Sequence, residues 1–112
     1  MVELKRGDVV TVAVRGDYGK PRPALVVQSD LFLGAHPSVT LLPITSEILD
    51  APYYRITVEP GPANGLRKVS QVMIDKALTV PREKVGREIG ELDDETLVRV
   101  SRAIAVWMGI GS

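Results

Sequence analysis

The spacing of the apolar residues changes near residue 93, and this change limits the folds open to the chain. Before it, the apolar residues form short runs, several of them alternating with polar residues and broken by proline and glycine. After it, apolar residues recur at helical spacing, at Leu97, Val100, Ile104, Trp107 and Met108. Alternation indicates strands, and a spacing of three to four residues indicates an amphipathic helix. We therefore expect an α+β, mostly β fold in which antiparallel strands precede one C-terminal amphipathic helix.

The expected strands cover residues 10–14, 24–28, 39–42, 53–58, 68–73, 77–80 and 85–89, and the expected helix covers residues 94–108. Asp93, Asp94 and Glu95 suit the start of this helix, because carboxylates cap free N–H groups and favour the positive end of the helix dipole. Gly109 suits its end. A chain of 112 residues is large enough for one core but not two, so we expect a single domain over residues 1–112.

Composition excludes several kinds of site. The chain has no cysteine and one histidine, His36, which excludes disulfides, thiolate nucleophiles and cysteine-ligated zinc and argues against a histidine relay. The acidic residues are scattered or gathered at the helix start, so we expect no metal and no cofactor. No apolar run approaches a membrane span, and residues 1–6 lack the apolar core of a signal peptide. These features predict a cytoplasmic protein with no membrane partner.

Arg22 lies between Pro21 and Pro23, directly before an apolar run. Proline fixes its own φ and restricts the residue before it, so ordering the backbone around Arg22 costs little when an anion binds. A guanidinium can hold two phosphate oxygens at once. Thr45 and Ser46 follow a second apolar run, where hydroxyls can donate to phosphate or cap a turn. The pattern predicts a phosphate-binding site; the alternative is a surface arginine and an ordinary turn.

Five segments carry a resemblance: GDVV (7–10), RPALVV (22–27), PITS (43–46), GLRKVSQ (65–71) and IGELD (89–93). In this order and spacing they resemble the MazF/PemK (Kid) family of toxin endoribonucleases of type II toxin-antitoxin systems. The resemblance implies a small SH3-like barrel of antiparallel strands with an appended helix, the CcdB/MazF/PemK-like fold. It also implies that Arg22 and Thr45 are the catalytic residues.

The resemblance further implies RNA contacts from three segments. They are Arg15, Asp17, Tyr18 and Lys20 in the loop before Arg22, Ser46 after Thr45, and Arg67, Lys68, Ser70 and Gln71 further along. Cations in the loop would meet phosphates, and Tyr18 would stack on an unpaired base, although a plain hairpin connection is an equal alternative. Some relatives carry an acid at the position of Ser70, so the general base is open, with Asp75 as one candidate. His36 is interpreted as a solvated loop residue.

Two classes of function follow. The first is a metal-independent, sequence-specific endoribonuclease that cleaves single-stranded mRNA through 2′-hydroxyl attack, leaving 2′,3′-cyclic phosphate and 5′-hydroxyl ends. The resemblance implies a cognate antitoxin and a homodimer, for which Leu97, Trp107 and Met108 are available. The second class is a non-enzymatic, CcdB-like toxin that binds DNA gyrase. Retention of Arg22 and Thr45 favours the nuclease, whereas the formal net charge of zero and Ser70 in place of an acid favour the alternative.

Overall fold

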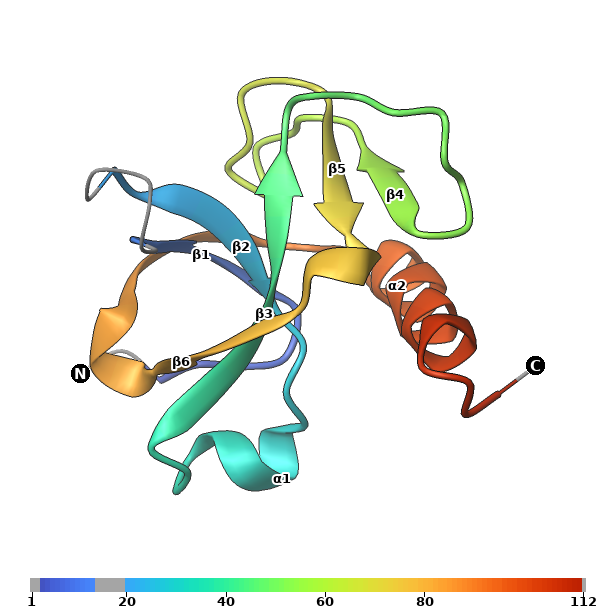
Figure 1. The fold of residues 1–112 in the computed structure, drawn as a ribbon. Coiled ribbons are helices and arrows are strands. Elements are labelled where there is room, and N and C mark those ends of the chain that lie inside the picture. Colours follow the sequence, from blue (N-terminus) through green and yellow to red (C-terminus); the bar gives the residue numbers. More distant parts are fainter. Residues whose placement is uncertain (1–2, 14–19, 112) are drawn as a thin grey trace.

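The computed structural model describes residues 3–13 and 20–111 (Figure 1). The strands are β1 (Asp8–Val12), β2 (Arg22–Val26), β3 (Ser38–Thr45), β4 (Arg55–Val58), β5 (Ser70–Met73), β6 (Leu78–Pro81) and β7 (Val85–Glu91). The helices are α1 (Asp30–Leu33) and α2 (Asp94–Trp107), with 3₁₀ turns η1 (Ile74–Lys76) and η2 (Arg82–Lys84). This arrangement confirms the predicted mostly β fold with a C-terminal helix.

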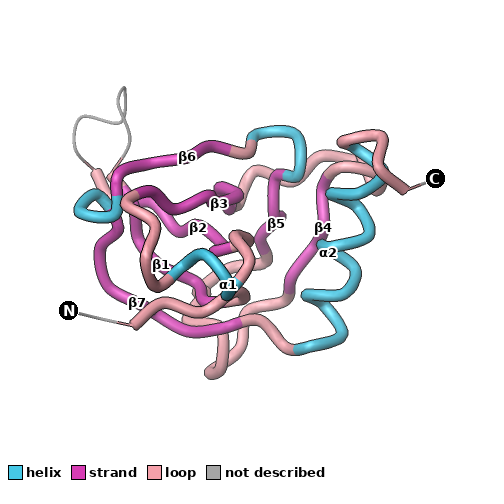
Figure 2. Tube along the Cα trace, turned by 90° about the horizontal axis from the view of Figure 1, so that it is seen from below, coloured by secondary structure: helices cyan, strands magenta, loops and turns pink. Residues whose placement is uncertain are grey.

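The described strands pair antiparallel in the order β4-β5-β3-β2-β1-β7, and β6 pairs with β3. Strand β3 joins the two parts of this sheet. Its earlier residues pair with β2 and β6, whereas Ile44 and Thr45 pair with β5. Figures 1 and 2 show β3 between the β1–β2–β7 part and the β4–β5 part, which lies against α2. Strand ends from both parts therefore meet where β3 ends.

The inner strands are apolar on both faces because the sheet lies between two cores. Successive side chains of a strand point to opposite faces. In β3, Val39 and Leu41 enter one core while Leu42 and Ile44 enter the other. Strands β1 and β2 alternate in the same way, and α2 covers one of the two cores through the buried Val100. The packing explains why the run after Arg22 contains no polar residue before Gln28.

Helix α2 matches its prediction closely. Its N-cap is Asp93, whose carboxylate accepts hydrogen bonds from the Thr96 N–H at 3.1 Å and the Thr96 hydroxyl at 2.6 Å. Trp107 and Met108 are 52% and 62% exposed, so they are not core residues of this chain. Both side chains are therefore available to pack against a second molecule. No helix in residues 3–13 and 20–111 is long and apolar enough to cross a membrane.

Several boundaries differ from the predicted ones. Strand β3 continues past residue 42 through Pro43, which lies opposite Ala24 just before β3 changes partner from β2 to β5. Proline has no N–H to donate, and it is tolerated where a ladder is interrupted. Strand β4 starts only at Arg55, because a turn in which the Arg55 N–H donates to Ala51 precedes it. The one-turn helix α1, capped by Ser29, was not predicted.

Candidate active site

Arg22 and Thr45 come to the same end of the sheet. The antiparallel partners Ala24 and Pro43 fix this, because Arg22 lies two residues before Ala24 and Thr45 two residues after Pro43. Across the next strand, Thr45 pairs with Gln71. In Figure 1 β3 ends at the top, beside the start of β5, and β2 begins to the left of it. The register therefore places a cation and a hydroxyl at corresponding ends of β2 and β3.

The backbone at Arg22 is held by strand pairing while the residue itself is exposed. Arg22 pairs with Val12 of β1, and Pro23 pairs with Thr11. The strand thus fixes where the side chain begins, and the residue as a whole is exposed. Such a guanidinium can contact two non-bridging oxygens of one phosphate.

Thr45 has one of the two roles considered for it in the sequence, since it caps a turn. Its Oγ1 accepts a hydrogen bond from the backbone N–H of Glu47 at 3.1 Å, so it caps the turn that follows β3. A hydroxyl has two lone pairs and one hydrogen, so Thr45 can still donate its hydrogen to a ligand. Ser46, the next residue, is exposed. The turn therefore presents hydroxyl donors without using charge.

Ser70 and Gln71, which we expected to contact RNA, have side chains that are hydrogen-bonded within the chain. Both are buried. The Ser70 hydroxyl donates to the carbonyl of Lys68 at 2.9 Å, and the Gln71 amide is bonded to Leu49 and Thr57. These side chains hold neighbouring backbone in place instead of extending to a ligand. The Ser70 hydroxyl is thus committed to the backbone of its own chain.

Arg67 and Lys68 are exposed, and the loop before them is fixed against β7. Asn64 organises that loop: its Oδ1 accepts from the N–H groups of Gly61 and Leu66, and its Nδ2 donates to Glu59. Lys20 is exposed near the start of β2. These three cations precede β2 and β5, the strands that pair with the last residues of β3. The other predicted loop contacts, Arg15, Asp17 and Tyr18, lie outside the described residues.

Asp75 lies away from this end of the sheet. It follows β5, whose first residues are near Thr45, and its carboxylate forms an ion pair with Arg55 Nε at 3.3 Å. His36 is also elsewhere, in the loop after α1, where its Nδ1 accepts from the Ser38 N–H. Neither residue supplies a base at the site. Within residues 3–13 and 20–111, no three acidic or histidine side chains are grouped so that they could hold a metal ion.

Glu47 was missed in the sequence. It is exposed, and its N–H is the donor to Thr45, so a carboxylate belongs to the same turn as the candidate catalytic hydroxyl. The signal was available, because Glu47 is the second residue after Thr45 in the sequence. A turn capped by Thr45 keeps the backbone of residues 45 and 47 close together.

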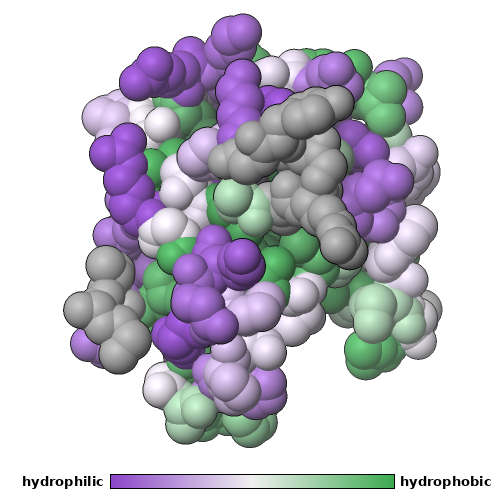
Figure 3. All heavy atoms as spheres, turned by 60° about the vertical axis from the view of Figure 1, so that its left-hand side comes forward, coloured by the Kyte–Doolittle hydropathy of each residue, from purple (hydrophilic) through white to green (hydrophobic). Residues whose placement is uncertain are grey.

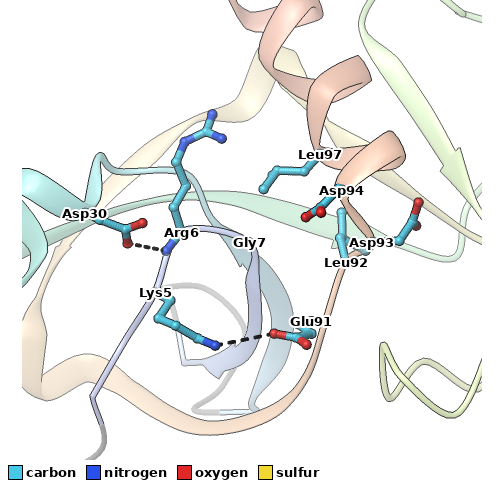
Figure 4. Close-up of a pocket in the computed structure, with 9 residues that line it drawn as sticks. All are labelled: Lys5, Arg6, Gly7, Asp30, Glu91, Leu92, Asp93, Asp94 and Leu97. Carbon is cyan, nitrogen blue, oxygen red and sulfur yellow. Dashed lines mark hydrogen bonds and ion pairs between the residues drawn. The ribbon is translucent and has the colours of Figure 1, made fainter.

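The hollow of 460 Å³ beside the start of α2 is not part of this site (Figure 4). The hollow is lined by residues that precede β1, whereas Arg22 pairs with Val12 at the other end of that strand. Its walls include Asp30, which accepts from the Arg6 N–H at 2.8 Å, and Glu91, which pairs with Lys5 at 3.6 Å. Carboxylates in the hollow would repel a phosphate chain.

In Figure 3, hydrophilic residues are spread over the visible face, with apolar surface between them.

Comparison with known proteins assigns the family. Residues 5–108 match the family of PemK-like, MazF-like toxins of type II toxin-antitoxin systems. The chain belongs to this family. It is 49% identical to the "Probable endoribonuclease MazF" of Mycolicibacterium smegmatis (strain ATCC 700084 / mc(2)155) over 108 residues, which cover 96% of this chain and 98% of the relative. The resemblance seen in the sequence is thus confirmed.

A more distant relative and a solved structure also match along nearly the whole chain. "Endoribonuclease EndoA" of Bacillus subtilis (strain 168) is 25% identical over 111 residues, covering 96% of each chain. A solved "Endoribonuclease in complex with its cognate antitoxin from Mycobacterial species" superposes with a TM-score of 0.78 at 22% identity, covering 100% of this chain and 99% of that one. The latter likeness concerns the fold alone. It supports the MazF-like topology described above.

Proposed function

We propose that this MazF-like toxin is a metal-independent endoribonuclease that cleaves single-stranded mRNA. The observation that carries the proposal is the register of β2 and β3, in which the partners Ala24 and Pro43 bring Arg22 and Thr45 to corresponding ends of the two strands. A cation and a neutral donor beside each other suit the charge that develops on a phosphate under attack. The endoribonuclease name of the relative at 49% identity supports the same activity.

The reaction needs only groups of the RNA and of this chain. The 2′-hydroxyl oxygen attacks the adjacent phosphorus, the bond from phosphorus to the 5′-oxygen breaks, and a 2′,3′-cyclic phosphate and a 5′-hydroxyl end result. Arg22 holds the two non-bridging oxygens as negative charge grows on them, and the Thr45 O–H donates to one of them. The 2′-hydroxyl loses a proton and the departing 5′-oxygen gains one.

Glu47 is our candidate for the group that accepts the 2′-hydroxyl proton. Ser70 is buried and its hydroxyl is bonded to Lys68, so it does not take this role. Glu47 is exposed and lies in the turn that Thr45 caps. A carboxylate close to the nucleophile can act as a general base. Glu47→Gln, which keeps the shape and removes the base, is expected to slow cleavage at saturating RNA.

RNA would be held by the cations around the end of β3. Lys20, Arg67 and Lys68 are exposed there, and Ser46 adds a hydroxyl. Arg15, Asp17 and Tyr18 are proposed to complete the contacts. Single strands are the expected substrate because unstacked bases can be read at their edges, unlike the bases of an A-form duplex. Lys68→Ala is therefore expected to weaken RNA binding more than it slows the chemical step.

A homodimer and a cognate antitoxin complete the proposal. The C-terminal end of α2 and the residues after it expose large apolar side chains, namely Val106, Trp107, Met108 and Ile110. Burying them against a second copy would remove them from water. Leu97, which we expected at the same interface, packs instead against the core of its own chain. An acidic antitoxin segment over the cations of the site would compete with RNA.

The test is cleavage of a short single-stranded RNA in the presence of EDTA, with analysis of the product ends. We expect cleavage to be unaffected by EDTA and to leave 2′,3′-cyclic phosphate ends. Dependence on added magnesium would contradict the mechanism. No cleavage at any RNA sequence in a randomised pool, together with binding to DNA gyrase, would favour the non-enzymatic, CcdB-like alternative.

A further inference from the structure

Gln71 ties the loop after β3 to the sheet. Its side-chain Oε1 accepts a hydrogen bond from the backbone N–H of Leu49 at 3.0 Å, and its Nε2 donates to the carbonyl of the same residue at 2.9 Å. Nε2 also donates to the Thr57 hydroxyl at 3.2 Å. One amide thus satisfies both backbone groups of Leu49, as a neighbouring strand would.

The amide of Gln71 has no donor left for a ligand. A primary amide has two N–H hydrogens, and both are used, one by Leu49 and one by Thr57. The residue is only 3% exposed. A side chain that is buried and committed to its neighbours in this way would have to break these bonds to reach RNA, and leaving Leu49 unpaired would be costly.

The tie acts on the turn that carries the candidate active site. Thr45 and Gln71 are cross-strand partners, so their side chains lie on the same face of the sheet. Thr45 holds the start of the loop through Glu47, and Gln71 holds it again at Leu49. Ser46 and Glu47 lie between the two anchors. Without the second anchor, the loop would be fixed only by the strand that precedes it.

We propose that Gln71 is a positioning residue, which holds the loop of residues 46–50 so that Thr45, Ser46 and Glu47 keep the geometry that cleavage requires. The kinetic consequence of this proposal rests on the proposed function, whereas the hydrogen bonds to Leu49 are independent of it. The proposal replaces direct RNA contact by Gln71. Small displacements of reacting groups reduce rates strongly, so losing the anchor affects the chemical step more than RNA affinity.

Gln71→Leu is the first variant, because leucine fills much of the same buried volume without hydrogen bonds. We expect hydrogen exchange at the Leu49 amide to become at least about tenfold faster. The single-turnover rate at saturating RNA should fall by about ten- to a hundredfold, whereas the Kd for an uncleavable RNA should change less than about threefold.

Thr57→Val is the matched control. It removes one hydrogen bond of the Gln71 amide and leaves both hydrogen bonds to Leu49. Hydrogen exchange at Leu49 and the cleavage rate should therefore stay near the wild-type values.

Gln71→Glu adds a readout that loss of folding would not produce. A protonated glutamic acid can accept from the Leu49 N–H and donate to the Leu49 carbonyl, as glutamine does, whereas a carboxylate would repel that carbonyl. Burial raises the pKa of a carboxyl group. The rate of the variant relative to wild type should therefore rise as the pH falls, and the Leu49 amide should regain protection over the same pH range.

Three outcomes would overturn the proposal. They are wild-type exchange at Leu49 in Gln71→Leu, a loss that appears in RNA affinity while the saturated rate is unchanged, or a flat pH profile for the relative rate of Gln71→Glu. Failure of the proposed function is separate, since wild type itself would then not cleave RNA. The exchange measurement at Leu49 would still test the anchor in that case.

Discussion

Ala24 of β2 lies opposite Pro43 of β3, and this pairing decides where the candidate active site forms. Two residues further in opposite chain directions, the strands carry Arg22 and Thr45. A shift of one residue in the pairing would turn a whole strand face from one core to the other. Because both faces of these strands are buried, the two cores hold the register and thereby the spacing of the two functional groups.

Gly90 permits the loop before Arg67 to lie against β7. A Cβ at Gly90 would lie 2.6 Å from the carbonyl oxygen of Asn64, which is too close without movement of backbone. We expect Gly90→Ala to lower the free energy of unfolding by about 3 kcal/mol. Gly34→Ala is the control, since its Cβ would meet nothing within 4 Å and its φ is −69°. Urea unfolding of both variants checks this; equal midpoints would contradict it.

We expect Asp75 to stabilise the fold and to take no part in cleavage. Its side chain and that of Arg55 are 14% and 9% exposed, and they form an ion pair at 3.3 Å. Asp75→Asn leaves the arginine without its counter-charge, so the free energy of unfolding should fall by about 3 kcal/mol. The cleavage rate per folded molecule should be unchanged. Glu83→Gln, at an exposed acid, serves as the control for charge removal, and a cleavage defect confined to Asp75→Asn would refute this assignment.

Asp93 makes helix α2 sensitive to acid. The hydrogen bonds from the Thr96 hydroxyl and backbone N–H lower the pKa of Asp93 below its ordinary value of 3.8. Its stabilising effect is therefore complete above that value and is lost as the pH falls through the lower pKa of the folded state. Asp93→Asn, which can still cap the helix, should reduce this part of the acid sensitivity. Thermal unfolding between pH 2 and 6 measures it, and parallel curves for both proteins would count against the explanation.

We expect Glu88 to destabilise the protein at neutral pH. A side-chain hydrogen bond with the buried Asp8, together with the negative charge of Asp8, raises the pKa of Glu88 above its ordinary value of 4.5. A raised acid pKa in the folded state means that stability is lost as the pH rises through this range. Glu88→Gln should therefore raise the Tm at pH 7, and the gain should vanish below about pH 4.5. A gain that persists unchanged at pH 3 would exclude this electrostatic cause.

Local patterns in the sequence predicted most of the fold but only part of the site. Helix α2 and the inner strands follow from periodicity, because each buries a regular row of apolar residues. Arg22 and Thr45 follow from the proline-flanked arginine and the hydroxyl after an apolar strand. The buried position of Gln71 could not be predicted, because no local pattern shows that its amide forms hydrogen bonds with Leu49. Glu47 was missed although it lies two residues after Thr45, because this spacing alone does not show that the Glu47 N–H donates to the Thr45 hydroxyl.

The central claim is that Arg22 stabilises the transition state of RNA cleavage, and single-turnover kinetics at saturating RNA in EDTA test it most directly. Arg22→Ala should remain folded and lose at least about a hundredfold in rate, the usual effect of removing one donor to a developing anion. Arg22→Lys should recover part of the rate, because an ammonium restores charge but not the two-pronged geometry. Arg102→Ala, at an exposed arginine of α2, should cleave like wild type. If Arg22→Ala cleaved saturating RNA at the wild-type rate, the account of this active site would be wrong.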